Sequence, residues 1–251
     1  GQSSRSNPVT YIKAYDDIRN LFAKQSASKQ FSFKPKHFSF NVDGGRCDDC
    51  KGEGTIKVEM QFMADINLIC ETCKGKRFKK NVLQVTYQNK NIDDILKMTI
   101  DEGYNFFHEN GQNKIANKLK ALIDVGMGYV NLGQSSSTLS GGEAQRIKLA
   151  SFILKGQSAA KTLFIFDEPT TGLHFHDIKK LLNSFNHLIS YGHSIIVVEH
   201  NIELIKSSDY IVDLGPYGGI KGGELIFEGS PEKLVKNKKS LLTKFLKTKL
   251  G

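Results

Sequence analysis

Four cysteines carry the plainest chemistry in the sequence. Cys47 and Cys50 form one C-x2-C pair, and Cys70 and Cys73 form a second pair after 19 intervening residues. This spacing is typical of a structural zinc site, in which four thiolates complete the coordination and leave no open position for catalysis. Lys-Gly follows each pair, so the two pairs are an internal repeat. Disulfides or unbound thiols are the alternative interpretation.

Two carboxylates and a histidine follow apolar runs typical of buried strands. Asp167 and Glu168 come directly after the run 162–166, and His200 comes shortly after the run 194–198. Adjacent carboxylates at the end of a buried strand are costly unless they have cationic partners or catalytic work. Asp167 is therefore a candidate for assisting Mg²⁺, and Glu168 for polarising an attacking water. His200 would lie on the edge where ligands bind in open α/β sheets, and a hydrogen-bonded core histidine is the alternative.

The octet Leu139–Arg146 has the features of a helix start. Ser140 is a good N-cap, and Glu143 completes a capping box with it. Gly141 and Gly142 each weaken a helix by about 1 kcal/mol, which makes sense where a ligand must approach the backbone. Free N–H groups and the positive end of the helix dipole favour an anion such as phosphate. A plain capped helix that tolerates two glycines is the alternative.

A basic cluster directly follows the second cysteine pair. Its members are Lys74, Lys76, Arg77, Lys79 and Lys80. Beside a rigid metal site, such a cluster would suit contacts with a nucleic-acid phosphate backbone. The net charge of +9 also suits a polyanionic partner. A solvated, lysine-rich surface is the alternative for both observations.

The composition is that of a soluble globular protein. The chain has 251 residues, of which 39% are hydrophobic and 24% charged. The sequence contains no apolar run near the roughly 18 residues of a membrane span and no signal-peptide pattern, so we expect a cytoplasmic protein without membrane contact. It begins Gly-Gln-Ser-Ser rather than with Met, which indicates a fragment or a processed chain.

The elements that must position these residues alternate between helices and strands. Periodicity and caps predict helices at 15–23 and 115–123, after Asn91, Thr99, Ser140 and Ser230, and at 178–189. Strands are predicted at 56–62, 66–68, 82–87, 162–166, 194–198, 210–214 and 224–227. The stretch 24–36 is predicted to be a loop. The alternating Phe31, Phe33, Phe38 and Phe40 favour two short strands, with nucleic-acid stacking as the alternative.

Together these motifs resemble the UvrA family, the damage-recognition ATPases of bacterial nucleotide excision repair. The matching stretches are Phe38–Lys80, Leu132–Gln134, the octet, Asp167–His174, Glu199–Asn201 and Ile211–Pro216. The octet resembles the signature motif of ATP-binding cassette (ABC) ATPases. The cysteine insertion upstream of it, and His174 where most ABC proteins have an aspartate, separate this family from transporter ATPases. The resemblance covers nearly the whole chain and corresponds to the C-terminal part of the second ATPase half.

The resemblance implies an α/β fold with four parts. These are an N-terminal segment of the ATPase half at 1–45, a zinc-clipped β-hairpin module at 46–80, a helical signature subdomain at 81–133 and the ABC core at 134–251. The core is incomplete, because no G-x-x-x-x-G-K-[ST] phosphate loop occurs in the chain and its one Gly-Lys pair, Gly75-Lys76, lies in the second cysteine knuckle. We therefore expect the chain alone neither to bind ATP tightly nor to hydrolyse it.

The resemblance also implies roles and partners. The cysteines would hold zinc that shapes a DNA-contacting module, and Ser140, Gly141 and Gly142 would meet the γ-phosphate of ATP bound by the other half. Gln145 would also be a nucleotide-binding residue. Asp167 would assist Mg²⁺, Glu168 would be the catalytic carboxylate, and His200 would sense the γ-phosphate. The resemblance further implies a repair protein of the SOS response, whose partners would be damaged double-stranded DNA, UvrB, a second copy in a homodimer and the N-terminal ATPase half. A zinc-dependent DNA-binding module without ATPase activity, or a UvrA-like paralogue in antibiotic self-protection, is the alternative.

Overall fold

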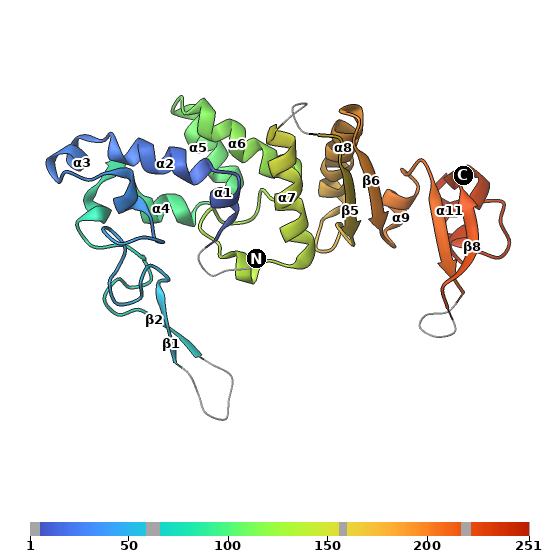
Figure 1. Cartoon of the computed structure of the whole chain (residues 1–251), viewed down its shortest axis with the longest axis horizontal. Helices are drawn as coiled ribbons and strands as arrows, with labels where there is room; N and C mark the ends of the chain where they lie inside the picture. The colour runs from blue at the N-terminus through green and yellow to red at the C-terminus, as the bar shows by residue number, and fades with distance from the viewer. Residues whose placement is uncertain (1–5, 59–65, 156–159, 217–221, 251) are drawn as a thin grey trace. The chain divides into compact units, whose positions relative to one another are not determined.

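The computed structural model describes residues 6–58, 66–155, 160–216 and 222–250, and it divides into two units, Gly1–Ser158 and Ala159–Gly251. Figure 1 traces the chain through both units. The predicted parts at 1–45, 46–80 and 81–133 all lie in the first unit, which also holds the start of the predicted part at 134–251. The finer division stays a prediction.

The first unit is mostly helical and carries one hairpin arm. Its helices are α1 (Pro8–Tyr11), α2 (Ala14–Ala23), α3 (Ser26–Gln30), η1 (Pro35–Phe38), η2 (Val82–Gln84), α4 (Ile92–Lys97), α5 (Ile100–Glu109), α6 (Asn113–Asp124), η3 (Ser136–Thr138) and α7 (Gly141–Lys155). Its strands are β1 (Thr55–Val58), β2 (Ile66–Ile69), β3 (Thr86–Tyr87) and β4 (Lys90–Asn91). The strand predicted at 82–87 is therefore reduced to its last two residues.

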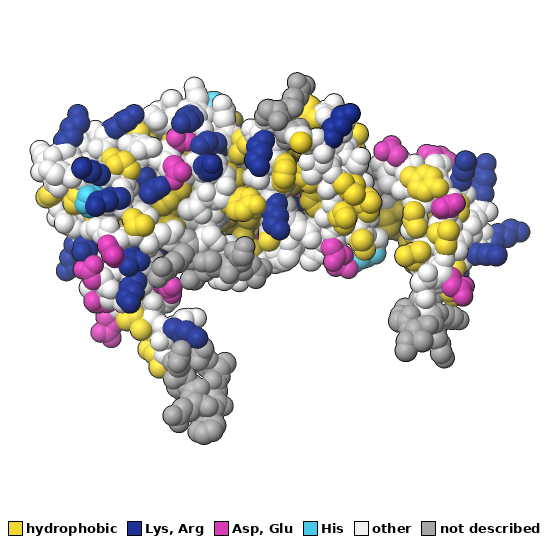
Figure 2. All heavy atoms as spheres, in the orientation of Figure 1, with side chains coloured by type: hydrophobic (Ala, Val, Ile, Leu, Met, Phe, Trp, Pro, Cys, Tyr) yellow, Lys and Arg dark blue, Asp and Glu magenta, His cyan; other side chains and the backbone are white. Residues whose placement is uncertain are grey.

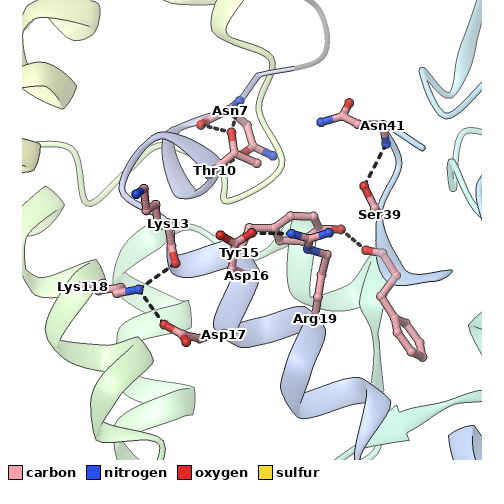
Figure 3. A network of polar contacts seen from close by, with 11 residues as sticks. Asn7, Thr10, Lys13, Tyr15, Asp16, Asp17, Arg19, Ser39, Asn41 and Lys118 are labelled. Atoms are coloured by element: carbon pink, nitrogen blue, oxygen red, sulfur yellow. Dashed lines mark hydrogen bonds and ion pairs between the residues drawn. The ribbon is translucent and has the colours of Figure 1, made fainter. Parts of the chain in front are cut away.

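The phenylalanines after α2 do not form the two predicted strands. Phe38 lies in the 3₁₀ helix η1 and is fully buried, with its ring centre 5.5 Å from that of Phe22 in α2. The hydroxyl of the buried Tyr15 donates to the Phe38 carbonyl at 2.6 Å, as Figure 3 shows. The alternation of Phe with polar residues therefore reflects packing on a helix rather than strand period, and the loop predicted at 24–36 contains the short helix α3.

Asp17 joins α2 to α6 through two lysines. Its carboxylate lies 2.8 Å from the Lys114 ammonium. It also lies 2.6 Å from the ammonium of Lys118, which donates to the Lys13 carbonyl as well (Figure 3). Although burial raises it, these ion pairs hold the pKa of Asp17 below its ordinary value. The predicted helix at 15–23 is thereby fixed on the helix predicted at 115–123.

The hairpin arm forms as predicted from the strand period. β1 and β2 pair antiparallel, with Ile56 opposite Leu68 and Val58 opposite Ile66. The part of the predicted strand beyond Val58 lies outside the described residues. In Figure 1 the arm extends from the helices of the first unit.

The second unit contains a parallel and an antiparallel strand pair. Its elements are β5 (Leu163–Asp167), α8 (Phe175–Ser190), β6 (Ser194–Val198), α9 (Ile202–Ile205), β7 (Ile211–Gly215), β8 (Glu224–Gly229), α10 (Pro231–Leu234) and α11 (Leu242–Leu250). β5 pairs parallel with β6, and β7 pairs antiparallel with β8. The alternation of helices and strands predicted for this half of the chain is confirmed.

Helix α8 covers one face of the β5–β6 pair and leaves the other exposed. Phe166 of β5 is buried, and its ring centre lies 4.9 Å from that of Phe185 in α8. On the opposite face Ile165 is 67% exposed and Val198 is 57% exposed. Figure 2 shows hydrophobic side chains on the surface of this unit. The apolar run has the composition of a strand buried on both faces, but only one face is covered here.

A helix must be both long and apolar to cross a membrane. Within the described part of the chain, no helix is both long and apolar enough to cross a bilayer.

Candidate functional site

The four cysteine sulfurs form one buried cluster in the first unit, within 4.8 Å of one another. The Sγ atoms of Cys47 and Cys70 are 3.9 Å apart, and those of Cys50 and Cys73 are 3.6 Å apart. These distances exclude S–S bonds of about 2.05 Å. A tetrahedral zinc ion with bonds of about 2.3 Å needs sulfur separations of about 3.8 Å. The cluster is therefore compatible with zinc.

The predicted internal repeat appears as two similar backbone turns. Lys51 and Lys74 have φ angles of 50° and 51°, and the following Gly52 and Gly75 have φ angles of 87° and 79°. Successive left-handed residues turn the chain sharply after the second cysteine of each pair, and glycine adopts this conformation without steric cost. Both pairs can therefore turn their sulfurs toward one centre.

Protonation of the thiols differs across the cluster. The backbone N–H of Cys73 lowers the pKa of the Cys70 thiol to about 7, whereas burial raises the pKa of the Cys73 thiol to about 12. Burial also raises the pKa of Cys47. Because metals bind thiolates, occupation of the cluster would release protons and weaken as the pH falls.

The four lysines that are predicted to contact DNA differ in their surroundings. Lys74, Lys76 and Lys80 are exposed, so their ammonium groups are accessible to a polyanion. The Lys79 ammonium lies 2.9 Å from a carboxylate oxygen of Asp48, which belongs to the first cysteine knuckle. The role of all four in DNA contact stays a prediction.

Arg77, the fifth member of the basic cluster, is held within the fold. Its Nη1 donates to the Gly133 carbonyl at 2.9 Å, and its guanidinium lies 5.4 Å from the centre of the Phe40 ring. The Arg77 carbonyl accepts from the N–H of Cys47 at 2.8 Å. Arg77 therefore links the cysteine cluster to the segment that leads into the octet, a placement that sequence spacing could not reveal.

The octet starts α7 with the predicted capping box. The Glu143 N–H donates to Ser140 Oγ at 3.2 Å, and the Ser140 N–H donates to Glu143 Oε2 at 2.8 Å. Gly141 is exposed, and a Cβ built there would meet nothing within 4 Å. Gly142 is buried and Gln145 half-buried. The backbone at the start of α7 is therefore open to an approaching ligand on the side of Gly141.

Tyr129 supports this helix start and was missed by sequence reasoning. Its hydroxyl donates to Glu143 Oε1, and Nη2 of the fully buried Arg146 lies 3.5 Å from the Tyr129 oxygen. Burial raises the pKa of Tyr129 to about 12, so the hydroxyl keeps its proton at neutral pH. Fourteen residues separate the tyrosine from the glutamate, and no local pattern signals their contact.

Replacing Glu143 by alanine is expected to destabilise the first unit by about 1 kcal/mol at pH 7, because the carboxylate that accepts the Ser140 N–H and the Tyr129 hydroxyl is lost. Although burial raises it, hydrogen bonds from Tyr129 and Ser140 hold the pKa of Glu143 below its ordinary 4.5. The stabilisation is therefore complete above pH 4.5 and is lost as the pH falls through the lower folded-state pKa. Urea unfolding of both chains from pH 7 to pH 3 should show this difference shrink. Tyr129→Phe should reduce the pH dependence, and a difference that is constant with pH would contradict the assignment.

The ends of β5 and β6 bring the predicted acidic and histidine side chains to one sheet edge. Asp167 lies opposite Val198 in the parallel register, and the Glu168 N–H donates to the Val198 carbonyl at 2.9 Å. Glu168 Oε1 and His200 Nδ1 are 3.6 Å apart, with the side chains 53% and 79% exposed. His200 is thus an exposed residue at the strand ends, not the core histidine of the alternative interpretation.

The octet belongs to the first unit and the carboxylates belong to the second. Residues 48–171, which contain both the octet and Asp167–Glu168, match the ABC transporter family. UvrABC system protein A of Clostridium perfringens is 53% identical over 247 residues, and that of Aquifex aeolicus is 50% identical over 247 residues, each alignment covering 98% of this chain. The crystal structure of UvrA2 from Deinococcus radiodurans covers 100% of this chain at 39% identity with a TM-score of 0.87. The chain is similar to UvrA over its whole length.

The similarity to UvrA extends over a limited part of the relatives. The chain spans 26% of the length of the two UvrABC system A proteins and 30% of the UvrA2 chain. Its structure has the ABC ATPase type of α/β fold found in UvrA2. The predicted resemblance to UvrA is confirmed, and so is the predicted fold at this level.

Proposed function

We propose that this chain is part of a UvrA-type ATPase that recognises damaged double-stranded DNA in nucleotide excision repair and loads UvrB. One observation carries the ATPase assignment. Glu168 and His200 meet at 3.6 Å where two parallel strands end, in a chain that is similar to UvrA throughout. Ligands of open α/β sheets bind at this edge, and phosphoryl transfer needs a group there that orients the attacking water.

In the proposed reaction, Glu168 orients a water for attack on the γ-phosphorus of ATP and accepts the proton that the water loses, and the bond to the β-phosphate oxygen breaks as ADP leaves. The exposed carboxylate can accept a hydrogen bond from that water. His200, which lies in the turn after β6, contacts an oxygen of the γ-phosphate. Asp167 is the ligand proposed for Mg²⁺, which would neutralise charge on the phosphates.

In this proposal the octet forms a second surface that contacts a nucleotide. Ser140, Gly141 and Gly142 begin α7, where backbone N–H groups and the helix dipole favour a phosphate, and Gln145 lies one turn further. The chain has no phosphate loop, so both surfaces act on ATP bound by another part of the protein or by a second copy. The exposed apolar face of β5–β6 supports this, because the strands and helix of a phosphate-binding segment would cover it.

The cysteine cluster and its lysines are proposed to serve DNA contact. Zinc held by the four thiolates would fix the two knuckles, and the exposed Lys74, Lys76 and Lys80 would meet phosphates without reading bases. UvrB and a second copy of the protein are the other proposed partners. The proposed location of the protein is the cytoplasm. An alternative function, a zinc-dependent DNA-binding module without ATPase activity, is favoured by the same cluster.

The purified chain is expected to show no ATP hydrolysis above buffer, whereas the full-length protein should hydrolyse ATP. The reason is that the chain supplies Glu168, His200 and the octet but no loop to hold phosphates. A coupled ADP-release assay on both proteins measures this. Hydrolysis by the chain alone that disappears in Glu168→Gln would contradict the proposal, and a full-length protein without ATP hydrolysis would favour the module.

A further inference from the structure

Glu199, the first residue after β6, connects the two turns that carry the proposed catalytic groups. Its Oε1 accepts the backbone N–H of Thr170 at 3.0 Å and also the Thr170 hydroxyl. Its Oε2 accepts the N–H groups of His200 at 2.8 Å and Asn201 at 2.9 Å. One half-buried carboxylate thus receives four hydrogen bonds, two from the turn after β5 and two from the turn after β6.

Each turn held by Glu199 contains one of the reacting groups. Thr170 is two residues beyond Glu168, whose carbonyl accepts the N–H of Thr171 at 3.1 Å and whose φ of 45° lies in the left-handed region. A non-glycine residue in this region persists only where its surroundings hold it. On the other side, Asn201 caps α9 by accepting the Glu203 N–H at 3.0 Å. The conformations of Glu168 and His200 therefore share one anchor.

The chemistry of this anchor requires a carboxylate. An ionised carboxylate only accepts hydrogen bonds and offers about four lone-pair sites, which matches the four donors. A glutamine amide at the same position would turn an NH₂ group toward either the Thr170 pair or the His200 and Asn201 pair, and donors would then face donors. Although burial raises it, these hydrogen bonds hold the pKa of Glu199 below its ordinary 4.5.

We propose that Glu199 is a positioning residue for ATP hydrolysis, which fixes the Glu168 turn and the His200 turn in a single arrangement. This inference rests on the proposed function, because it concerns the geometry of groups that the proposal makes catalytic. Glu199 acts through its neighbours and does not touch the nucleotide. Loss of the anchor lets the two turns move independently, which lowers the rate of the chemical step more than it changes ATP binding.

The test is steady-state ATP hydrolysis by the full-length protein carrying Glu199→Gln. We expect kcat to fall about 10²-fold, the cost of misplacing a reacting group by about 1 Å, while the KM for ATP changes by less than about 2-fold. Thr170→Val should lower kcat in the same direction, and Thr170→Ser, which keeps the hydroxyl, should restore it. Glu228→Gln on β8, which removes one negative charge from an exposed position, is the control for the change in charge and should behave as wild type.

A background variant separates failure of the inference from failure of the proposed function. In Glu168→Gln protein, adding Glu199→Gln should lower kcat by a smaller factor than it does in wild type, because only the positioning of His200 remains to be lost. Wild-type kcat in Glu199→Gln together with an inactive Glu168→Gln would overturn the inference alone. Wild-type kcat in Glu168→Gln would overturn the proposed function. If Glu199→Gln protein does not fold by circular dichroism, the Thr170 pair decides, and equal kcat in Thr170→Val and Thr170→Ser contradicts the inference.

Discussion

A chain with Cys70 replaced by serine is expected to bind zinc far more weakly than the wild-type chain, which should bind one zinc ion. Cys70 is fully buried, and its sulfur lies 3.9 Å from that of Cys47 within a cluster of four. Structural zinc contributes about 10–16 kcal/mol to folding in zinc-finger peptides, and three thiolates leave the fourth coordination position to water, so part of this free energy is lost. Zinc content by mass spectrometry, with hydrogen exchange of residues 46–80, measures both effects.

The loss should stay local to the knuckles and the Arg77 link. The sulfurs form a cluster of their own, separate from the helical core around Phe22 and Leu119. Far-ultraviolet circular dichroism should therefore change little, while exchange at Cys47 should rise, because the Cys47 N–H donates to the Arg77 carbonyl. Thr72→Ala, between the second pair of cysteines, is the control and should keep its zinc. A wild-type chain that is isolated without zinc and binds none on titration under reducing conditions would contradict the zinc assignment.

DNA affinity of the same chains tests the DNA-contact part of the proposal. Duplex binding that is equal in wild type and Cys70→Ser would separate DNA contact from the cysteine cluster. Binding that falls with zinc loss and with rising salt would support a phosphate contact organised by the knuckles.

Features defined by local chemistry could be predicted from the sequence. The cysteine spacing predicted a cluster of four ligands, and the Ser140–Glu143 capping box is present as predicted. Parallel strands whose ends meet at one edge followed from two apolar runs, each with acidic residues after it. The capping box is predictable because its two residues are close in sequence. The cysteine cluster and the strand pair are predictable because the same local pattern occurs twice in the chain.

Features that depend on distant partners could not be predicted. Phe38 follows strand-like alternation, yet it lies in a 3₁₀ helix and is fully buried against Phe22 of α2. Arg77 belongs to a basic run, and only the fold shows that the Gly133 carbonyl engages it. The composition of β5 indicated a strand buried on both faces but gave no sign of what would cover the second face.

Glu168→Gln in the full-length protein is expected to lower kcat for ATP hydrolysis by about 10²- to 10⁴-fold, the usual contribution of a general base. The amide keeps the size of the carboxylate and loses the negative charge that orients a water. The side chain is 53% exposed at the sheet edge and its backbone N–H is bonded to Val198, so the fold should tolerate the change. Urea unfolding of the purified chain should therefore give the same midpoint for both forms.

In the Glu168→Gln variant the rate of ATP hydrolysis should fall while the affinity for ATP is kept. Glu168→Gln protein should still bind ATP and retain the nucleotide-bound state longer, because chemistry and not binding is slowed. Asp167→Asn should instead weaken binding of Mg²⁺ and ATP, since the proposed role of Asp167 is at the metal. Single-turnover hydrolysis and equilibrium binding of a fluorescent ATP analogue distinguish the two. A Glu168→Gln protein with a wild-type single-turnover rate would show that Glu168 is not the catalytic carboxylate. The 3.6 Å contact between Glu168 and His200 would then have only a structural role, between the turns that follow β5 and β6.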